Sequence, residues 1–395
     1  MQNFPHPIDI LVVGCGLTGA VVARELAEYG KKVLLWDRRD HIGGNMFDYT
    51  DPYGIHVHKY GPHTFHTNDQ TLYDYICRFS DWQAYELKCG AEIDGKCTPV
   101  PFNFQTLDDF YTPEKAAQIK QCLLERFANR TTASVVDVLN CGEPLAVAYA
   151  NFLFEKDYRP YSAKQWGVPP ETIDPSILER VPLRFSYKDS YFDDTYQCIP
   201  KTTYADFFNA LLNHPNIQLE LQKEALQHLR ISQDSSHVLF NGARAGFKVV
   251  YTGALDELFG CRFGELPYRS LHFEWKHEDI ESKQNMPVVA YPQAEGYTRI
   301  VEYKKMPPQD VRGTTYEVEY PRQYCSANGD EPYYPLMTEQ SLRLYQRYRE
   351  LASNVDGLYC CGRLGDFKYY NMDQALGHAL ELVSLLKSEE HETVF

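Results

Sequence analysis

A glycine-rich turn between two apolar runs constrains the fold of this chain more than any other feature. Residues 8–13 form an apolar run typical of a buried parallel strand, and residues 32–36 form a second run that ends at Asp37. The turn after the first run has the spacing Gly-x-Gly-x-x-Gly and precedes a helical stretch; its glycines are Gly14, Gly16 and Gly19. The sequence therefore predicts a β-α-β unit that binds a dinucleotide.

Each position of this turn has a physical reason. Gly14 allows the tight turn, Gly16 lets a diphosphate approach the backbone, and Gly19 lets the helix pack closely on the strand. The diphosphate would lie at the positive N-terminus of the helix, and Asp37 can accept a hydrogen bond from a ribose hydroxyl. A glycine-rich turn without a ligand is the alternative. The expected cofactor contacts are Gly14, Gly16, Leu17, Thr18, Gly19 and Asp37.

Two further segments favour FAD over NAD. Residues 38–45 (RRDHIGGN) resemble the Gly-Gly motif that follows the second strand in FAD proteins of the two-dinucleotide-binding-domain class. A late strand ends at residues 362–363, and the final helix opens after residues 369–371. In that class this junction lies against the flavin, where the helix N-terminus can stabilise negative charge on a reduced ring. The further cofactor-binding residues are Arg38, Gly43, Gly44, Asn45, His58, Gly362, Arg363, Asn371 and Met372.

The charge and composition of the chain disfavour several classes of protein. The chain has 395 residues and a formal net charge of −15, which argues against nucleic-acid binding because such binding relies on a basic surface. No apolar stretch approaches the roughly 18–20 residues that span a membrane, and the N-terminus lacks the cationic region of a signal peptide. The eleven cysteines are odd in number and include no Cys-x-x-Cys pair, so reduced thiols are expected. We expect a cytoplasmic protein with no membrane partner.

The pattern of elements predicts an α/β protein whose first domain is discontinuous. Residues 71–165 are mainly helical by their periodicity, and several short strands between 269 and 320 resemble an antiparallel sheet. The expected fold is a Rossmann-like FAD-binding domain with a helical insertion domain and an antiparallel β-sheet domain. The expected boundaries are 1–70, 203–260 and 336–395 for the FAD-binding domain, 71–165 for the helical domain, and 166–202 with 261–335 for the sheet domain, which carries a mobile substrate lid near 183–192.

An ordered set of short motifs resembles the bacterial UDP-galactopyranose mutases. The match runs from Ile8 to about Leu385, almost the whole chain, and it is the order of the motifs that makes it specific. The motifs are 58–67 (HKYGPHTFHT), 101–103 (PFN), 161–167 (YSAKQWG), 181–185 (VPLRF), 191–192 with 196–197 (YF and YQ), 297–299 (YTR), 330–335 (DEPYYP), 362–363 (GR) and 369–370 (YY).

The resemblance implies roles for residues in these motifs. Arg184, on the lid, and Arg299, on a strand, would bind the diphosphate of the substrate. His63 and His66 belong to a loop beside the flavin and the sugar. The remaining substrate-binding residues implied are Tyr161 and Trp166 for the uridine, Tyr196, Tyr369 and one of Tyr333 and Tyr334 (Tyr334 is favoured) for the diphosphate, and Phe185 and Asn103. No metal site is expected, although His56, His58, His63 and His66 are close in sequence.

The resemblance also implies a reaction. A pyranose ring contracts to a furanose while the sugar begins and ends linked to its nucleotide diphosphate, and N5 of reduced FAD is the nucleophile at the anomeric carbon. Members of the family are often homodimers, and NAD(P)H or another reductant would supply the reduced flavin. Asn371 stands where the family often has an acid, and Ala290 where an asparagine is expected. These two departures concern which sugar or nucleotide is used.

Other interpretations of the same residues stay open. A flavin oxidoreductase such as an amine oxidase would use the same FAD motifs, and a non-catalytic binding protein could share the fold, as the guanine-nucleotide dissociation inhibitors do. A mutase for a different UDP- or dTDP-sugar would share every motif. The arginines could also be solvated charges, the aromatic residues packing material, and the histidines structural.

Overall fold

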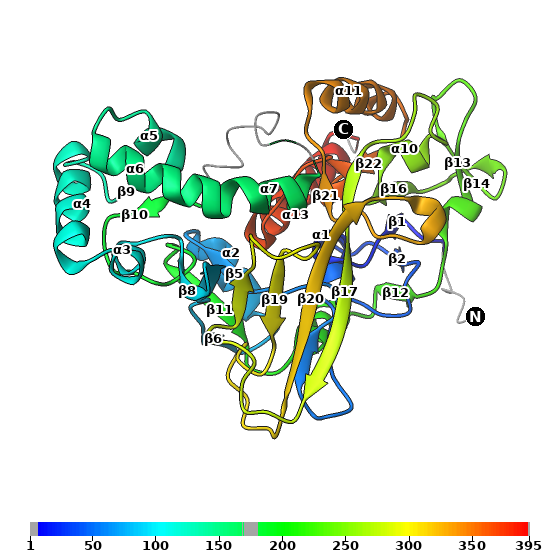
Figure 1. Cartoon of the computed structure of the whole chain (residues 1–395). Coiled ribbons are helices and arrows are strands. Elements are labelled where there is room, and N and C mark those ends of the chain that lie inside the picture. The colour runs from blue at the N-terminus through cyan, green and yellow to red at the C-terminus, as the bar shows by residue number, and fades with distance from the viewer. Residues whose placement is uncertain (1–6, 168, 170–180, 394–395) are drawn as a thin grey trace.

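The predicted β-α-β unit lies at the centre of a five-stranded parallel sheet in the computed structural model, which describes residues 7–167, 169 and 181–393 (Figure 1). Each neighbouring pair of strands is parallel. Such strands are buried on both faces, which explains why they are continuous apolar runs. The strand order is β12 (Ile217–Glu220), β2 (Val33–Trp36), β1 (Ile10–Val13), β16 (Lys248–Tyr251) and β22 (Leu358–Cys360).

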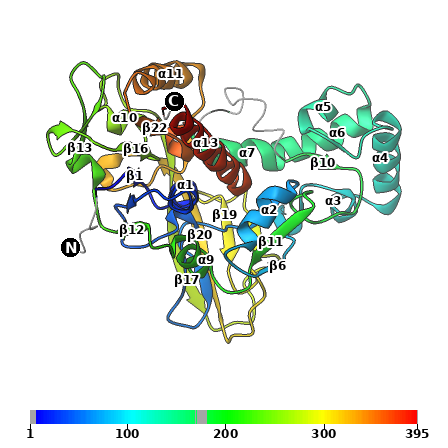
Figure 2. The same ribbon diagram turned by 180° about the vertical axis from the view of Figure 1, so that it is seen from behind.

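Two separate cores cover the two faces of this sheet. Alternate residues of β1 show the division, because Val12 belongs to one core and Leu11 to the other. The first core is formed with α1 (Leu17–Glu28), α9 (Tyr204–Leu212) and α13 (Met372–Thr393), which Figure 2 shows together. The second is formed with β13 (Leu229–Ile231), β14 (Val238–Phe240), α10 (Leu255–Leu258) and α11 (Glu339–Ser353). The parallel sheet with helices on both sides confirms the predicted α/β class.

A seven-stranded sheet forms the second part of the molecule. Neighbouring strands in this sheet are antiparallel, except that β18 and β7 are parallel. The sheet is therefore mixed, whereas a wholly antiparallel sheet was expected. Its order is β21 (Tyr334–Pro335), β17 (Tyr268–Glu278), β20 (Thr314–Gln323), β19 (Arg299–Glu302), β18 (Val288–Ala290), β7 (Cys89–Ile93) and β8 (Lys96–Val100). β7 and β8 come from within 71–165, the range expected to form the helical domain.

A helical lobe lies to one side of this sheet (Figure 1). Its helices are α3 (Phe104–Phe110), α4 (Pro113–Arg126), α5 (Val135–Leu139) and α6 (Pro144–Leu153), and they enclose a core of their own. A π-helical turn, η2 (Phe154–Tyr158), joins α6 to α7 (Arg159–Trp166), and this run extends toward α13. Pro160 lies at the start of α7 and has no backbone N–H to donate, which accounts for an irregular turn before it.

The segment after residue 180 pairs with two parts of the molecule. Its first strand, β10 (Leu183–Arg184), pairs with β9 (Thr132–Ala133) of the helical lobe, and Leu183 belongs to the core of that lobe. Its second strand, β11 (Tyr196–Pro200), lies between β5 (Phe65–Thr67) and β6 (Trp82–Ala84). The segment 181–202, expected within the sheet domain, therefore does not join the seven-stranded sheet.

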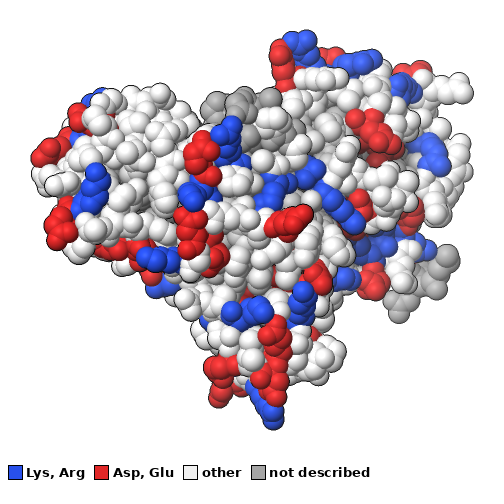
Figure 3. Space-filling view, viewed as in Figure 1, with Lys and Arg blue, Asp and Glu red and all other residues white. Residues whose placement is uncertain are grey.

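Short elements complete the described structure. They are η1 (Gly44–Met46), β3 (Asp48–Thr50), β4 (His56–His58), α2 (Gln70–Cys77), η4 (Ala225–Gln227), β15 (Ala243–Arg244), η5 (Ser326–Asn328) and α12 (Gly362–Gly365). Acidic and basic side chains are interspersed over the face in Figure 3. Within the described ranges, no helix has both the length and the apolar character to cross a membrane.

Candidate active site

The first of two adjoining cavities lies at the carboxyl ends of β1, β2 and β16. It has a volume of about 240 Å³. This is the edge of a parallel sheet at which nucleotide ligands usually bind. Nearly all the predicted cofactor-binding residues line it: Gly14, Gly16, Leu17, Thr18, Gly19, Asp37, Arg38, Gly43, Gly44, Asn45, Gly362, Arg363, Asn371 and Met372. His58 does not.

Close backbone packing at this cavity fits a dinucleotide such as FAD. Gly14 has a φ of +101°, and a Cβ atom there would lie 2.0 Å from Oγ1 of Thr252. A Cβ atom on Gly44 would lie 2.8 Å from Cα of Gly16. α1 begins after Gly16 without a side-chain cap, so the N–H groups of its first turn point to the cavity edge with no side-chain acceptor. The residues thus form a cradle for a diphosphate.

Asp37 and several residues that sequence reasoning missed complete the first cavity. The Asp37 carboxylate accepts hydrogen bonds from the backbone N–H groups of Cys15, at 2.6 Å, and Arg39, at 2.8 Å, which fixes its orientation. Thr252, Gly253, Lys223 and Glu224 also line the cavity, but they come from loops after β16 and β12. Only the small Thr-Gly pair directly after the strand at 248–251 gave a signal that could have identified them.

The second cavity, of about 300 Å³, adjoins the first. Predicted residues lining it include Arg299, His63, His66, Tyr161, Trp166, Tyr333, Tyr334 and Tyr369. The two cavities share Asn45, His63, Arg363, Asn371 and Met372. A group held in the first cavity can therefore meet a molecule held in the second, and His63 and Arg363 lie where the two would meet.

Arg299 brings a fixed positive charge to the second cavity. Its Nε atom donates to Oε2 of Glu319 at 2.6 Å, and this buried carboxylate raises the pKa of the guanidinium. Arg299 and Glu319 are paired neighbours on β19 and β20. Because Glu319 occupies Nε, the two terminal NH₂ groups stay available for an anion.

A second buried acid lies next to Glu319. Glu317 is two residues earlier on β20, hence on the same face, and accepts a hydrogen bond from the hydroxyl of Tyr303 at 2.9 Å. Oε2 of Glu317 and Oε1 of Glu319 are buried and have no partner among the described residues. Burial, followed by the charge of Glu319, raises the pKa of Glu317 well above its ordinary value. The neutral form of Glu317 is therefore favoured over what an exposed glutamate would show.

The two predicted histidines at the cavity have different surroundings. His63 hydrogen-bonds through Nδ1 to the carbonyl of Gly61 at 2.8 Å, so Nδ1 carries the proton and Nε2 is an acceptor. Burial lowers the pKa of His63 to about 4, and the ring is neutral at pH 7. Its backbone N–H donates to Nδ1 of His58, which places fully buried His58 beneath it and away from both cavities.

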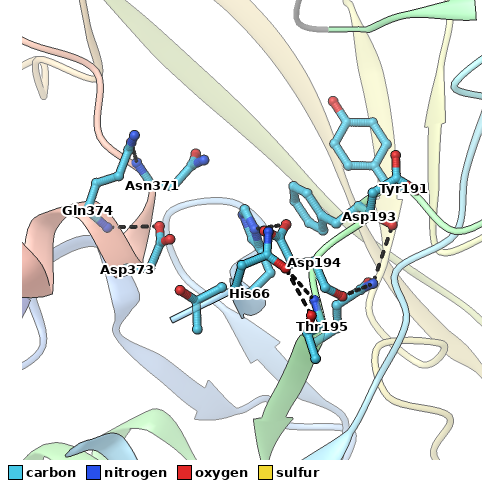
Figure 4. Close-up of polar contacts among 12 residues, drawn as sticks. His66, Tyr191, Asp193, Asp194, Thr195, Asn371, Asp373 and Gln374 are labelled. Carbon is cyan, nitrogen blue, oxygen red and sulfur yellow. Dashed lines mark hydrogen bonds and ion pairs between the residues drawn. The ribbon is translucent and has the colours of Figure 1, made fainter. Parts of the chain in front are cut away.

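His66 connects the cavity wall to the expected lid. Its Nδ1 hydrogen-bonds to Oδ2 of Asp194 at 2.8 Å, a contact dashed in Figure 4. Its ring stacks on Phe192 with the ring centroids 3.6 Å apart. Phe192 and Tyr191 line the second cavity. At the opposite side of the close-up, the backbone N–H of Asn371 donates to Oε1 of Gln374 at 3.0 Å, immediately before α13 begins.

Besides His58, four predicted site residues line neither cavity. Arg184 is 4% exposed. Its guanidinium donates to the carbonyls of Ser190 and Tyr191 and to Asp193 at 2.8 Å. These contacts of its two terminal NH₂ groups hold the turn 184–193 together, while its buried Nε has no hydrogen-bond partner among the described residues. The other three are Phe185 in the core of the helical lobe, Asn103 at the N-cap of α3, and Tyr196, whose ring is stacked on Tyr73.

α7 is fixed in place by charged side chains. The Nζ atom of Lys164 donates to the carbonyls of Tyr291, Ala294 and Tyr297 at 2.6–2.8 Å. Arg269 donates to the carbonyls of residues 164 and 165 at the C-terminal end of the helix. Asp157 and Ala290 also line the second cavity, and sequence reasoning did not predict Asp157.

Asp48, His56 and His58 are close enough to suggest a metal site. The Asp48 carboxylate, however, already accepts hydrogen bonds from the backbone N–H groups of Tyr204 and Ala205 and from His56 at 2.8 Å. These contacts cap α9 and give the cluster a structural role.

Comparison with known proteins adds independent findings. The family described as UDP-galactopyranose mutase matches residues 156–369, and the family described as NAD(P)-binding Rossmann-like domain matches residues 12–79. The UDP-galactopyranose mutase of Mycoplasma pneumoniae (strain ATCC 29342 / M129 / Subtype 1) is 35% identical over 96% of this chain and 97% of its own. The dTDP-fucopyranose mutase of Escherichia coli is 32% identical over 95% and 97%. A crystal structure of reduced UDP-galactopyranose mutase superposes with a TM-score of 0.72 at 15% identity, over 97% and 94% of the two chains, and supports the fold.

Proposed function

This chain belongs to the UDP-galactopyranose mutase family and is an FAD-dependent isomerase, and we propose that it interconverts UDP-galactopyranose and UDP-galactofuranose. The observation that carries the proposal is the meeting of two cavities, a dinucleotide cradle and a chamber containing Arg299, at shared residues. When bound and reduced, FAD would supply a nucleophilic ring nitrogen without net oxidation of the sugar. The amine-oxidase-like alternative offers no role for the arginine and tyrosines of the second cavity.

The protein's first task is to hold the diphosphate while its bond to the anomeric carbon is broken and re-formed. Arg299 is suited to this because Glu319 orients it and its charge needs no reorganisation when the anion departs. Of the paired tyrosines, Tyr334 is the better candidate for a neutral donor, because it interacts electrostatically with Arg299 whereas Tyr333 packs against Phe273. Tyr161 also interacts electrostatically with Arg299.

The second task is to exclude water and close over the substrate. Tyr191 and Phe192 already line the chamber, while Arg184 is turned into its own segment. For Arg184 to bind the diphosphate, its contact with Asp193 must be exchanged for the substrate. We therefore place Arg184 on a lid that rearranges when substrate binds.

Cellular context follows from the same proposal. The enzyme would be a cytoplasmic homodimer that makes a precursor of cell-surface polysaccharide. NAD(P)H or another reductant would keep its flavin reduced. Size-exclusion chromatography with light scattering tests the dimer.

A turnover assay tests the function. The purified protein should absorb near 450 nm, and it should convert UDP-galactofuranose to the pyranose after reduction by dithionite or NAD(P)H, as followed by HPLC. Equal turnover by the oxidised enzyme in air would contradict the role of reduced FAD. Steady release of hydrogen peroxide would instead indicate an oxidase.

A dTDP-linked sugar is a second candidate substrate. The observation that favours it is Ala290, which lines the chamber where an asparagine was expected, together with the similarity to a dTDP-fucopyranose mutase. A panel of UDP- and dTDP-sugars offered to the reduced enzyme separates the two, because the preferred nucleotide would show the higher kcat/KM.

A further inference from the structure

Asp157 is an acid inside the substrate chamber to which the reaction assigns no role. It lines the second cavity, its residue is 9% exposed, and its carboxyl group makes no hydrogen bond or ion pair with any residue in the described part of the chain. A buried carboxyl group without a partner is costly, so its retention at a cavity wall points to a ligand that supplies the partner.

The helix presents Asp157 on the same face as Tyr161. Asp157 belongs to the π-helical turn η2 and Tyr161 to α7, four positions later, so the two side chains are neighbours along one side. Both line the chamber. Because Lys164 and Arg269 anchor α7 to the surrounding backbone, this face is held in position before a ligand arrives.

A chain of aromatic contacts shows which end of the chamber Asp157 occupies. Arg363 lines both cavities, and its Cζ atom lies 4.6 Å from the ring centroid of Tyr369. The ring centroids of Tyr369 and Tyr334 are 5.5 Å apart, and those of Tyr334 and Trp166 are 6.1 Å apart. Trp166 ends α7, and Asp157 lies nine residues earlier along the helical run, roughly 13 Å at the usual rise per residue. Asp157 is therefore at the end of the chamber far from the cofactor.

The nucleobase of a nucleotide-sugar must occupy this far end if the sugar lies against the cofactor. We propose that the carboxyl group of Asp157 binds the imide edge of a uracil or thymine base, namely its ring N–H and the adjacent carbonyl. This inference rests on the proposed function and adds the residue that reads the base.

A neutral carboxyl group is complementary to that edge. Its carbonyl oxygen accepts from the ring N–H, and its hydroxyl donates to the base carbonyl, which forms two parallel hydrogen bonds. Burial raises the pKa of Asp157 to about 7, opposed by the charge of Lys164, so the neutral form is populated at neutral pH. An ionised carboxylate keeps one of the two bonds and repels the base carbonyl. The affinity should therefore decline as the pH rises above 7.

Few other titratable groups surround Asp157. On its own helical run these are Tyr161 on the same face, Tyr158, whose hydroxyl donates to the carbonyl of Val181 at 2.6 Å, and Lys164, bound by three carbonyls. β7 packs against η2 and carries Cys89 and Glu92, and the lid contributes Tyr191. Among these, Lys164 is the group whose charge acts on Asp157.

Binding of two matched nucleotides tests the proposal. Isothermal titration calorimetry on the FAD-loaded protein would compare UDP with N3-methyl-UDP, which has the same phosphates but no ring N–H. The wild type should prefer UDP by about tenfold or more, which two hydrogen bonds can supply. Asp157→Ala should lose that preference. Asp157→Asn, which can both donate and accept, should keep it and lose its decline between pH 6 and 8.5.

Controls separate the possible failures. Asp94→Asn makes the same chemical change at an exposed carboxylate paired with Lys156, and it should bind both nucleotides as the wild type does. If Asp157→Ala keeps the full preference for UDP, the base-reading role is refuted while the mutase proposal stands. If GDP binds more tightly than UDP and depends on Asp157, the assignment to uracil or thymine is overturned. If the loaded wild type binds no nucleotide, the proposed function itself fails.

Discussion

At the residue scale, the ability of the chamber to bind an anion depends on the orientation of the Arg299 guanidinium group. Arg299 is bound to protein through Nε, and Glu319 is the partner that aims it. A lysine could carry the charge but could not present two donors in a fixed plane. Glu319 is thus a positioning residue, and Arg299 is the group expected to touch the diphosphate.

Arg299→Ala should therefore lower kcat by at least tenfold, since losing one preorganised donor typically costs about 10²–10³ in kcat. Arg299→Lys should recover only part of this loss. The flavin absorbance of both variants should equal that of the wild type, because Arg299 lines only the second cavity. Arg312→Ala, at an exposed ion pair with Asp279, is the control. Wild-type kinetics in Arg299→Ala would remove the assignment.

Gly14 tests the cofactor cradle at the same scale. Gly14→Ala introduces a Cβ atom 2.0 Å from Oγ1 of Thr252, at a φ of +101° that favours glycine. We expect the variant to purify with less than a tenth of the wild-type flavin, measured as the ratio of absorbance at 450 and 280 nm. Gly246→Ala has open space around the new atom and should retain its flavin.

At the element scale, β20 carries two neighbouring buried acids, Glu317 and Glu319. Arg299, on the adjacent strand β19, lines the chamber beside them. A proton on Glu317 can be donated to the unpartnered oxygen of Glu319, which satisfies both atoms. The raised pKa means that above the ordinary glutamate range the unfolded chain releases a proton that the folded protein keeps. The free energy of unfolding therefore falls as the pH rises through this range and up to the folded pKa.

Glu317→Gln needs no such proton, and its amide can still donate to Glu319. Its melting temperature relative to wild type should thus rise between pH 5 and pH 9, as followed by circular dichroism. Glu274→Gln, a half-exposed site on β17, should have the same melting temperature as the wild type at both pH values. A constant difference between Glu317→Gln and wild type across this interval would show that Glu317 is ionised in the folded protein.

The turn 184–193 is the element in which substrate and protein compete for one arginine. Arg184→Ala should reduce kcat/KM at least tenfold while FAD stays bound, because it loses both the clamp and the contacts that shape the turn. Asp193→Asn weakens only the ion pair that holds Arg184 within its own segment. We therefore expect it to change KM by less than Arg184→Ala does. Steady-state kinetics of the reduced enzymes would show this order, and the reverse order would argue against a lid that releases Arg184.

At the scale of the whole molecule, FAD would join distant parts of the chain. The residues that line its cavity come from near the N-terminus, from the loops after β12 and β16, and from the C-terminal junction. A ligand that binds only the folded state stabilises it by about 2.7 kcal/mol at a hundredfold excess over Kd. Removing FAD should lower the melting temperature by several degrees, and adding it back should restore the value. Equal melting of the apo and loaded forms would contradict FAD binding at this cavity.

The sequence by itself determined the features that depend on local chemistry. The strand, the Gly14 turn and the following helix are specified by residues that are neighbours in the sequence, so the parallel sheet and the cofactor cavity could be predicted. The spacing of glycines and of apolar residues indicates the local backbone conformation directly. The ordered motifs also placed Arg299, Tyr161 and Tyr334, which line the chamber.

Only the tertiary structure decided what depends on contacts between distant segments. The parallel pairing of β7 with β18 takes two strands from the expected helical domain, and no local pattern encodes it. Arg184 turns inward because two carbonyls and the Asp193 carboxylate of its own segment accept hydrogen bonds from its terminal NH₂ groups. In the sequence alone, Asp157 cannot be told from a solvent-exposed acid, because charged residues flank it. Its burial, and hence its chemistry, arises because η2 packs against β7 at the wall of the chamber.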